Sequence, residues 1–400
     1  MPAWRAHLSR RLQWDQACNA LAAEVAARKA RGLETIDLTE SNPTRVGLAY
    51  PEAALAEILG RSAAADYPPH PLGLPEAREA LAAALSRPGD QVAADDLVLT
   101  ASTSEAYSYL FKLFGDPGDE VLTAAPTYPL LDELTLLDAL VLRHFRLEPG
   151  PRFALDPGEI ERALTPRTKL LVLVHPANPT GTFLSQPEQD AVVELCVARG
   201  LPWVSDEVFA NYALDGKAEG DSARGHRAGP AAARKETLGF SLGGLSKSAG
   251  LPGWKLGWFR VGGPAADRRR IIAALERVAD AYLSVSTPVQ RALGDVLPLA
   301  SAIRAAILER LHRNLAVLES SLGGLPAVEI YRPEGGWSAV LRVPRLFTDE
   351  DLVLGVLRNA GVLVHPGYFF DFETDGFLVL SLLPEPGHFL EGARRLAAHL

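Results

Sequence analysis

Short apolar runs alternate with longer amphipathic segments through the middle of the chain. Runs of this length, without strict alternation of polar side chains, are typical of strands buried on both faces of a parallel sheet. The segments between them repeat apolar residues at the spacing of an amphipathic helix, as in 186–199. Strands are predicted at 97–100, 120–125, 139–145, 170–174, 237–242 and 256–261 and after residue 201, and helices include 157–164 and 186–199. This alternation, from about residue 97 to 262, predicts an α/β domain.

The pattern changes after residue 262. Helices are predicted at 265–281 and 298–322, with a break at 282–290; strands at 328–331, 337–343, 362–366 and 377–383; and further helices at 349–359 and 391–399. This mixture predicts a smaller α+β domain. The Arg-rich first 31 residues predict an amphipathic helix packed on the body of the protein, and we expect the N-terminal segment to join the smaller domain. The expected boundaries are 61–290 for the large domain and 1–60 with 291–400 for the small one.

Composition and charge exclude several classes of protein. The 400 residues are 48% hydrophobic and 22% charged, which is typical of a globular chain with a large core. The net charge of -9 does not favour nucleic acid or anionic lipid, and no apolar run is long enough to span a membrane. Cys18 and Cys196 lie far apart and lack the spacing of a metal site, so we expect free thiols, no metal and a cytoplasmic location. The glycine motifs of nicotinamide and nucleotide-triphosphate sites are absent.

One lysine has neighbours that suit a flat cofactor. Lys247 lies in SLGGLSKSAG (241–250), a segment of mostly small residues that begins within a predicted strand. It is either a solvated lysine in a flexible surface loop or an amine that forms a Schiff base with a cofactor. Two upstream strands end near Asn178, in NPTG, and Asp206, in SDEVF. Because parallel strands deliver side chains at their carboxyl ends, we expect Asn178, Asp206 and Lys247 to meet.

In this order and spacing, NPTG, SDEVF, the segment around Lys247 and GWKLG (253–257) resemble the fold-type-I aminotransferases of class I/II. This is the aspartate aminotransferase-like superfamily, whose members use pyridoxal 5'-phosphate (PLP). The resemblance covers nearly the whole chain. It implies the PLP transferase fold, a three-layer αβα large domain with a mostly parallel central sheet plus a smaller α+β domain. It also implies amino-acid and 2-oxo-acid substrates and a homodimer with shared active sites.

The resemblance also implies a role for individual residues. Lys247 would carry PLP as an internal aldimine and shuttle the α-proton of the substrate. Asp206 would keep the pyridine nitrogen protonated, and Asn178 would donate to the phenolate oxygen next to the substrate. Tyr128 would stack on the pyridine ring, and Tyr67 would reach the phosphate of the neighbouring subunit. From the sequence alone, Tyr67 is interpreted equally well as a packed residue in a rigid loop. For Tyr128 the alternative is a buried tyrosine in a loop.

The cofactor phosphate needs cations and N–H donors. Ser102, Thr103 and Ser104 begin a predicted helix, whose N-terminus offers unpaired N–H groups and a positive dipole, although an ordinary helix cap is the commoner use of such residues. The resembled family usually has glycine at position 103. The remaining candidates for the phosphate are Lys255 and a hydroxyl from Ser286 or Thr287.

Several positions depart from the resembled pattern. Phe209 stands where a tyrosine would donate to the phenolate, a loss that is expected to raise the pKa of the internal aldimine; Tyr212 is the candidate replacement. Lys255 replaces a phosphate-binding arginine and cannot form a bidentate fork. Gly244 replaces a serine. Val379, in FLVLSLL, stands where an arginine would clamp the substrate α-carboxylate.

We therefore expect a PLP-dependent aminotransferase that moves an amino group between an amino acid and a 2-oxo acid. Arg45, in the 41–45 loop that lies over the substrate in the resembled family, is the first candidate to bind the carboxylate. Because Val379 is apolar, an amine transaminase is an alternative. Lyase, decarboxylase or oxidase chemistry is another, since fold and cofactor do not fix the reaction. A catalytically idle PLP-binding protein is the last alternative.

Overall fold

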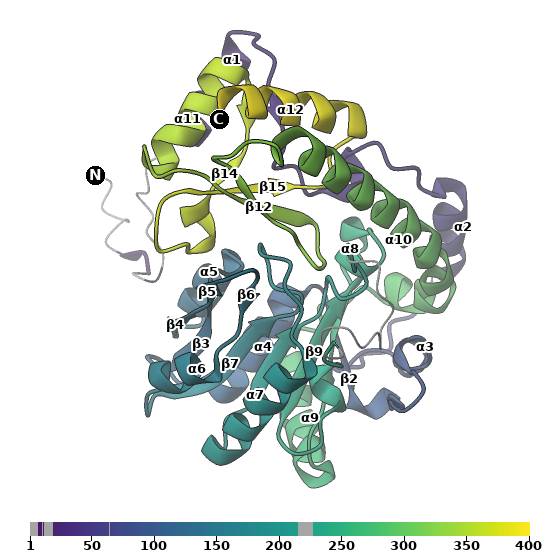
Figure 1. Cartoon of the computed structure of the whole chain (residues 1–400). Coiled ribbons are helices and arrows are strands. Elements are labelled where there is room, and N and C mark those ends of the chain that lie inside the picture. Colours follow the sequence, from purple (N-terminus) through teal and green to yellow (C-terminus); the bar gives the residue numbers. More distant parts are fainter. Residues whose placement is uncertain (1–6, 10, 12–18, 64, 215–226) are drawn as a thin grey trace.

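A seven-stranded sheet forms the centre of the larger part of the molecule, in the lower half of Figure 1. The structure, a computed structural model, describes residues 7–9, 11, 19–63, 65–214 and 227–400. The strand order is β2-β10-β9-β8-β7-β3-β4, and every pairing is parallel except the two that β10 makes. The strands are β2 (Leu97–Thr100), β3 (Glu120–Ala125), β4 (Val141–Arg146), β7 (Thr168–Val174), β8 (Trp203–Asp206), β9 (Gly239–Gly244) and β10 (Gly257–Val261).

The inner strands of this sheet are buried on both faces. Every residue of the inner strands β8 and β9 is buried, as is every residue of the edge strand β2, so these short strands show no alternation of buried and exposed positions. The helices associated with this part of the chain are α3 (Pro75–Leu85), α4 (Thr103–Phe114), α5 (Leu130–Leu137), α6 (Pro157–Ala163), α7 (Gln186–Arg199), α8 (Leu245–Ser248) and α9 (Ala265–Asp280). Local sequence fixes their ends: Ser185 and Glu188 form a capping box at the start of α7, and Gly200 ends it in the left-handed conformation.

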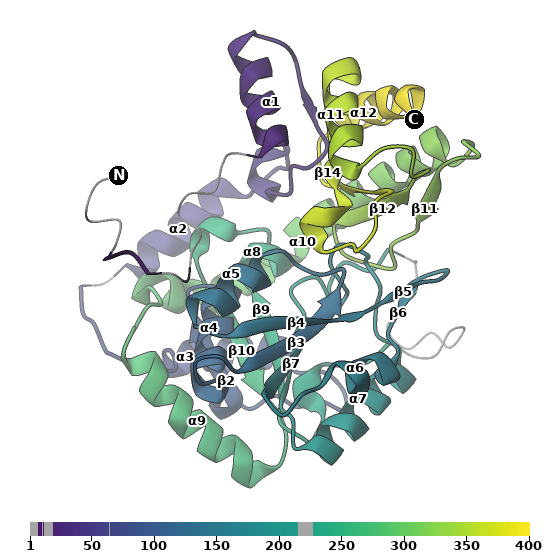
Figure 2. The same ribbon diagram turned by 90° about the vertical axis from the view of Figure 1, so that its left-hand side faces the viewer.

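A smaller antiparallel sheet lies above the first one in Figure 1. Its order is β11-β12-β15-β14, and nearby β1 pairs with β13 in parallel. The N-terminal α1 packs against α11, as Figure 2 shows. The remaining elements are α1 (Ala20–Ala30), β1 (Ile36–Asp37), α2 (Glu52–Ser62), β5 (Glu148–Pro149), β6 (Phe153–Ala154), α10 (Thr287–Leu322), β11 (Glu329–Tyr331), β12 (Ser338–Arg342), α11 (Asp349–Ala360), β13 (Val362–Leu363), β14 (His365–Pro366), β15 (Phe377–Ser381) and α12 (Pro386–His399).

The predicted fold class is confirmed: an α/β part with a mostly parallel sheet is accompanied by a smaller α+β part. Within the predicted N-terminal helix, α1 covers Ala20–Ala30, and most earlier residues lie outside the described part of the chain. No helix in the described ranges is long and apolar enough to cross a membrane. The domain boundaries at 61–290 and 291–400 stay a prediction.

The prediction that α10 begins at residue 298 was wrong. The helix begins at Thr287 and continues through Pro298 to Leu322. Pro288, in the first turn, is compatible with a helix start because the first N–H groups have no partner within the helix. Pro298 removes one interior hydrogen bond, but buried neighbours such as Val296 and Ala300 hold this stretch of the helix against the core.

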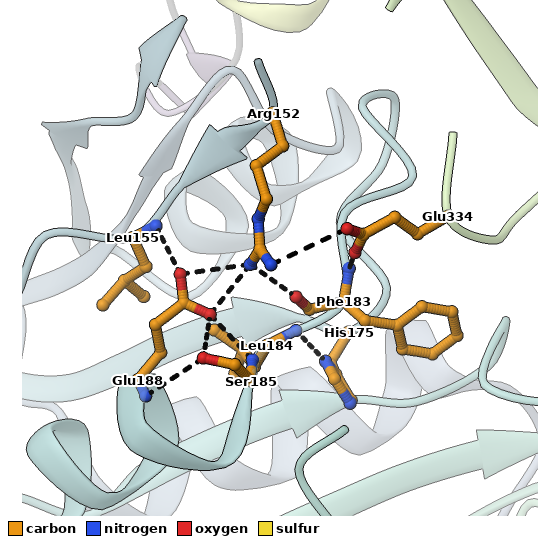
Figure 3. A network of polar contacts seen from close by, with 8 residues as sticks. All are labelled: Arg152, Leu155, His175, Phe183, Leu184, Ser185, Glu188 and Glu334. Atoms are coloured by element: carbon orange, nitrogen blue, oxygen red, sulfur yellow. Dashed lines mark hydrogen bonds and ion pairs between the residues drawn. The ribbon is translucent and has the colours of Figure 1, made fainter. Parts of the chain in front are cut away.

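A network of polar contacts links the hairpin β5–β6, the loop after β7 and the turn before β12 (Figure 3). At its centre, the Arg152 guanidinium donates to the Phe183 carbonyl at 2.8 Å and to the Glu188 carboxylate at 2.8 and 3.1 Å. Arg152 also lies 3.7 Å from Glu334, whose carboxylate accepts the Phe183 N–H at 2.9 Å. The arginine therefore restrains the segment that follows Asn178 and connects it to the smaller sheet.

We expect Arg152→Ala to lower the free energy of unfolding by about 1–3 kcal/mol, because the partly buried acceptors Glu188 and Phe183 lose a charged donor. Urea denaturation measures the change. The matched control is Arg313→Ala, since the Arg313–Glu309 pair is largely exposed and its loss should change stability by less than about 0.5 kcal/mol. Equal stability of the two variants would contradict a structural role for Arg152.

Candidate active site

A cavity of about 490 Å³ lies at the carboxyl ends of β7, β8 and β9, against residues of the smaller sheet. Asn178 follows β7, Asp206 ends β8, and Lys247 lies in α8, directly after β9. All three line the cavity, so the structure brings together the residues that the sequence predicted to meet. Five further predicted residues also line it: Ser102, Thr103, Ser104, Tyr128 and Lys255.

Asp206 is buried at the base of this cavity. Its carboxylate accepts a hydrogen bond from the Tyr107 hydroxyl at 2.8 Å and one from the Val208 N–H at 3.2 Å. Burial raises the pKa of Asp206 to about 6, although both hydrogen bonds and the nearby Lys247 charge lower it. Sequence reasoning missed Tyr107. The available signal was a tyrosine on α4, one helical turn after Thr103 and therefore on the same face of the helix.

The amine of Lys247 shares the cavity with aromatic side chains. Its Nζ lies 4.8 Å from the centre of the Trp337 ring and 5.6 Å from that of Phe209. Burial lowers the pKa of Lys247, while the charge of Asp206 opposes this shift. Tyr212 does not replace the missing donor at Phe209, contrary to the sequence-based suggestion. It is fully buried and donates its hydroxyl to the Lys247 backbone carbonyl at 2.5 Å, which fixes the backbone that carries the amine.

The cavity has the donors that an anion needs. The first residues of α4 line it, and the Ser102 hydroxyl also caps the helix by accepting the Glu105 N–H at 3.2 Å. Lys255 lines the same cavity from a left-handed backbone position. Gly257 lets this turn approach β10, because a Cβ there would lie 2.9 Å from the Ser102 carbonyl carbon.

The glycine at 244 has a packing explanation. An added Cβ would lie 3.3 Å from Gly257 Cα, a tight approach between β9 and β10. The serine of the resembled pattern would therefore require this part of the sheet to shift. Gly244 keeps the two strands close beneath the cavity, which it also lines.

Four predicted residues lie outside this cavity. Tyr67 is 59% exposed and, with Thr287, lines a separate cavity of about 10 Å³. Ser286 lines neither cavity. Arg45 is exposed and is not among the lining residues, although Thr39 and Ser41 from the same segment are. The structure therefore does not place Arg45 where it was predicted to bind the carboxylate.

The smaller sheet contributes a histidine that sequence reasoning did not single out. His365 and Val379 are register partners on β14 and β15, and both line the cavity. Val379 is buried, and it stands where the sequence pattern leads one to expect an arginine. The available signal for His365 was a polar residue at the end of the predicted strand 362–366, next to Pro366.

The chain is similar to known aminotransferases over most of its length. The family model for aminotransferase class I and II matches residues 34–385. An aspartate/prephenate aminotransferase of Thermus thermophilus is 28% identical over 98% of each chain. An alanine aminotransferase of Mycobacterium tuberculosis is 27% identical over 90% of this chain and 84% of its own length.

Solved structures agree with these relatives. A Thermus thermophilus aspartate aminotransferase mutant superposes with a TM-score of 0.84 at 27% identity, over 98% of this chain and 99% of the other. An alanine aminotransferase from Pyrococcus furiosus has the same fold, with a TM-score of 0.87 at 24% identity over 98% of each chain. Because the family model spans most of the chain, the protein belongs to the class I and II aminotransferases and is an enzyme that transfers amino groups.

Proposed function

We propose that this enzyme moves an amino group between an α-amino acid and a 2-oxo acid, with PLP held covalently at Lys247. The observation that supports this most is the shared cavity of a buried amine, Lys247, and a buried carboxylate, Asp206, at the ends of neighbouring strands. Members of this family use PLP. The names of the relatives favour amino-acid transamination over lyase, decarboxylase, oxidase or amine chemistry and over an idle protein.

The residues of the cavity fit the cofactor. Its volume of about 490 Å³ suits a flat cofactor together with a small substrate. Ser102, Thr103, Ser104 and Lys255 would hold the phosphate through N–H, hydroxyl and ammonium donors. The ring of Tyr128 would cover one face of the pyridine. Gly257 keeps the α4 turn close to β10, and residues of both line the cavity.

Each polar group then has a distinct task. When bound, PLP supplies an electron-poor ring that withdraws electrons from the amino-acid Cα. The Asp206 carboxylate would pair with the ring nitrogen and keep it protonated, while Tyr107 holds that carboxylate in place. The Asn178 amide would donate to the phenolate oxygen. The Lys247 amine, whose pKa burial lowers, is positioned to accept the Cα proton as a neutral base.

The proposal includes a cytoplasmic homodimer with shared active sites. Tyr67 is exposed and lies away from the cavity of its own subunit, which fits a residue that serves the neighbouring one. Thr287 lines the same small cavity as Tyr67 and is available to the same phosphate. Cys196 is buried and is free among the described residues, which is compatible with a reducing compartment. Sedimentation at twice the monomer mass supports the dimer, and a monomer with full activity contradicts it.

The assignment of Lys247 is tested by chemical trapping. Borohydride reduction of the loaded enzyme followed by peptide mapping should place the pyridoxyl group on Lys247, the cavity lysine whose amine lies beside Trp337 and Phe209. Lys247→Ala should lose essentially all turnover, whereas the matched control Lys235→Ala, at an exposed lysine, should retain it. A label on Lys255 would contradict the assignment.

Asp206→Asn should reduce kcat by a factor of about 10²–10³, as expected when a preorganised electrostatic partner is removed. Tyr107→Phe keeps the carboxylate but removes one of its donors, so its loss of kcat should be smaller. Turnover and melting temperature are measured on the same samples. If Asp206→Asn melts earlier but keeps its kcat per folded molecule, Asp206 has a role in the fold only.

A further inference from the structure

The cavity lacks the arginine that would pair with a substrate carboxylate. Among the residues that the structure describes, the basic side chains lining the cavity are those of Lys247, Lys255 and His365. Lys247 and Lys255 already have roles with the cofactor under the proposed function. A carboxylate that enters this cavity loses water and needs a hydrogen-bond donor there. His365 is the remaining basic group.

His365 lies beside the position where the arginine is missing. It is the register partner of Val379 on the adjacent antiparallel strand. Side chains of directly opposed residues stand on the same face of a sheet, with Cβ atoms about 4.5–5.5 Å apart. A histidine at 365 therefore reaches the space next to Val379 without a change in the backbone, and both side chains line the cavity.

The histidine ring has an unused polar atom. Its Nδ1 is buried and has no hydrogen-bond partner among the described residues. The rings of Phe369 and Phe370 lie 5.6 and 5.8 Å from the imidazole and enclose it, and Phe370 also lines the cavity. Buried polar atoms in native structures normally have a partner, so an imidazole with an unpaired nitrogen, in a side chain that lines a cavity, is free to pair with a ligand there.

We propose that His365 binds the α-carboxylate of the amino-acid substrate, in the place of an arginine at position 379. The inference rests on the proposed function, because it assumes that an amino acid is the substrate. A ring N–H donates one hydrogen bond to one carboxylate oxygen, whereas a guanidinium donates two parallel bonds. Burial lowers the pKa of His365, and the charge of Asp37 opposes this shift. Both the neutral and the protonated imidazole carry at least one N–H donor.

The test compares substrates that differ only in the carboxylate. L-Alanine is paired with isopropylamine, in which a methyl group replaces the carboxylate. His365→Leu should raise KM for L-alanine by about tenfold to a hundredfold, as expected for a lost hydrogen bond to a charged group. It should leave KM for isopropylamine unchanged. His365→Asn retains an N–H donor, so its KM for L-alanine should rise less.

A binding measurement makes the test independent of turnover. 2-Methylalanine has no Cα proton to lose, and its Kd can be followed by the fluorescence of Trp337, which lines the cavity. His365→Leu should raise this Kd by the same factor as KM. The double variant His365→Leu/Val379→Arg should recover most of the affinity, because an arginine then occupies the neighbouring strand position. His312→Leu, at an exposed histidine on α10, is the control and should bind like the wild type.

Each remaining outcome overturns the assignment. If Kd for 2-methylalanine and KM for L-alanine are unchanged in His365→Leu, or rise in Arg45→Ala instead, His365 does not bind the carboxylate. Transamination by the wild type and the pyridoxyl label on Lys247 would still support the proposed function in that case. A wild-type enzyme that binds and turns over isopropylamine but no amino acid overturns both. Melting temperatures of the variants separate these outcomes from unfolding.

Discussion

The burial of one amine and one carboxylate in a common cavity is the constraint on which the site depends. Asp206 ends β8 opposite Leu242 of β9, and Lys247 lies in α8, the short helix that directly follows β9. Burial raises the pKa of the Asp206 carboxyl and lowers that of the Lys247 amine, so it brings the pKa values of the two groups closer together. Neither shift would arise if these strands ended at an open surface.

The smaller sheet is what closes this cavity. Trp337 lies over the Lys247 amine, and Val379 and His365 line the same space. Arg152 connects the loop after β7 with Glu334, just before β12, and so restrains the two sides of the cavity relative to each other. The large sheet therefore supplies the groups expected to act on the cofactor, and the smaller sheet supplies surfaces expected to contact the substrate.

Much of the fold could be predicted from the sequence because its strongest signals are local. The apolar run of β7 and the strand before Asp206 indicate buried parallel strands, and together with β9 these strands place Asn178, Asp206 and Lys247 at one edge. The start of α10 was missed because a proline-containing segment reads as a break, while tertiary packing holds the helix across it.

The contacts of the site were less predictable, because they depend on pairings between distant segments. Tyr107 donates to Asp206 although the two residues lie 99 positions apart in the sequence. His365 stands beside Val379 only through the antiparallel register of β14 and β15. Arg45 lies in the short turn Pro43–Arg45, where it is exposed and does not line the cavity. Sequence spacing alone contains none of this register information.

We propose above all that this enzyme transfers an amino group from an amino acid to PLP bound in this cavity. The most direct test is to mix the PLP-loaded enzyme with single amino acids in the absence of any 2-oxo acid acceptor. We expect the release of one 2-oxo acid per active site, together with a change in the absorbance of the cofactor. Release of carbon dioxide or free ammonia, or an unchanged spectrum with every amino acid, would contradict it.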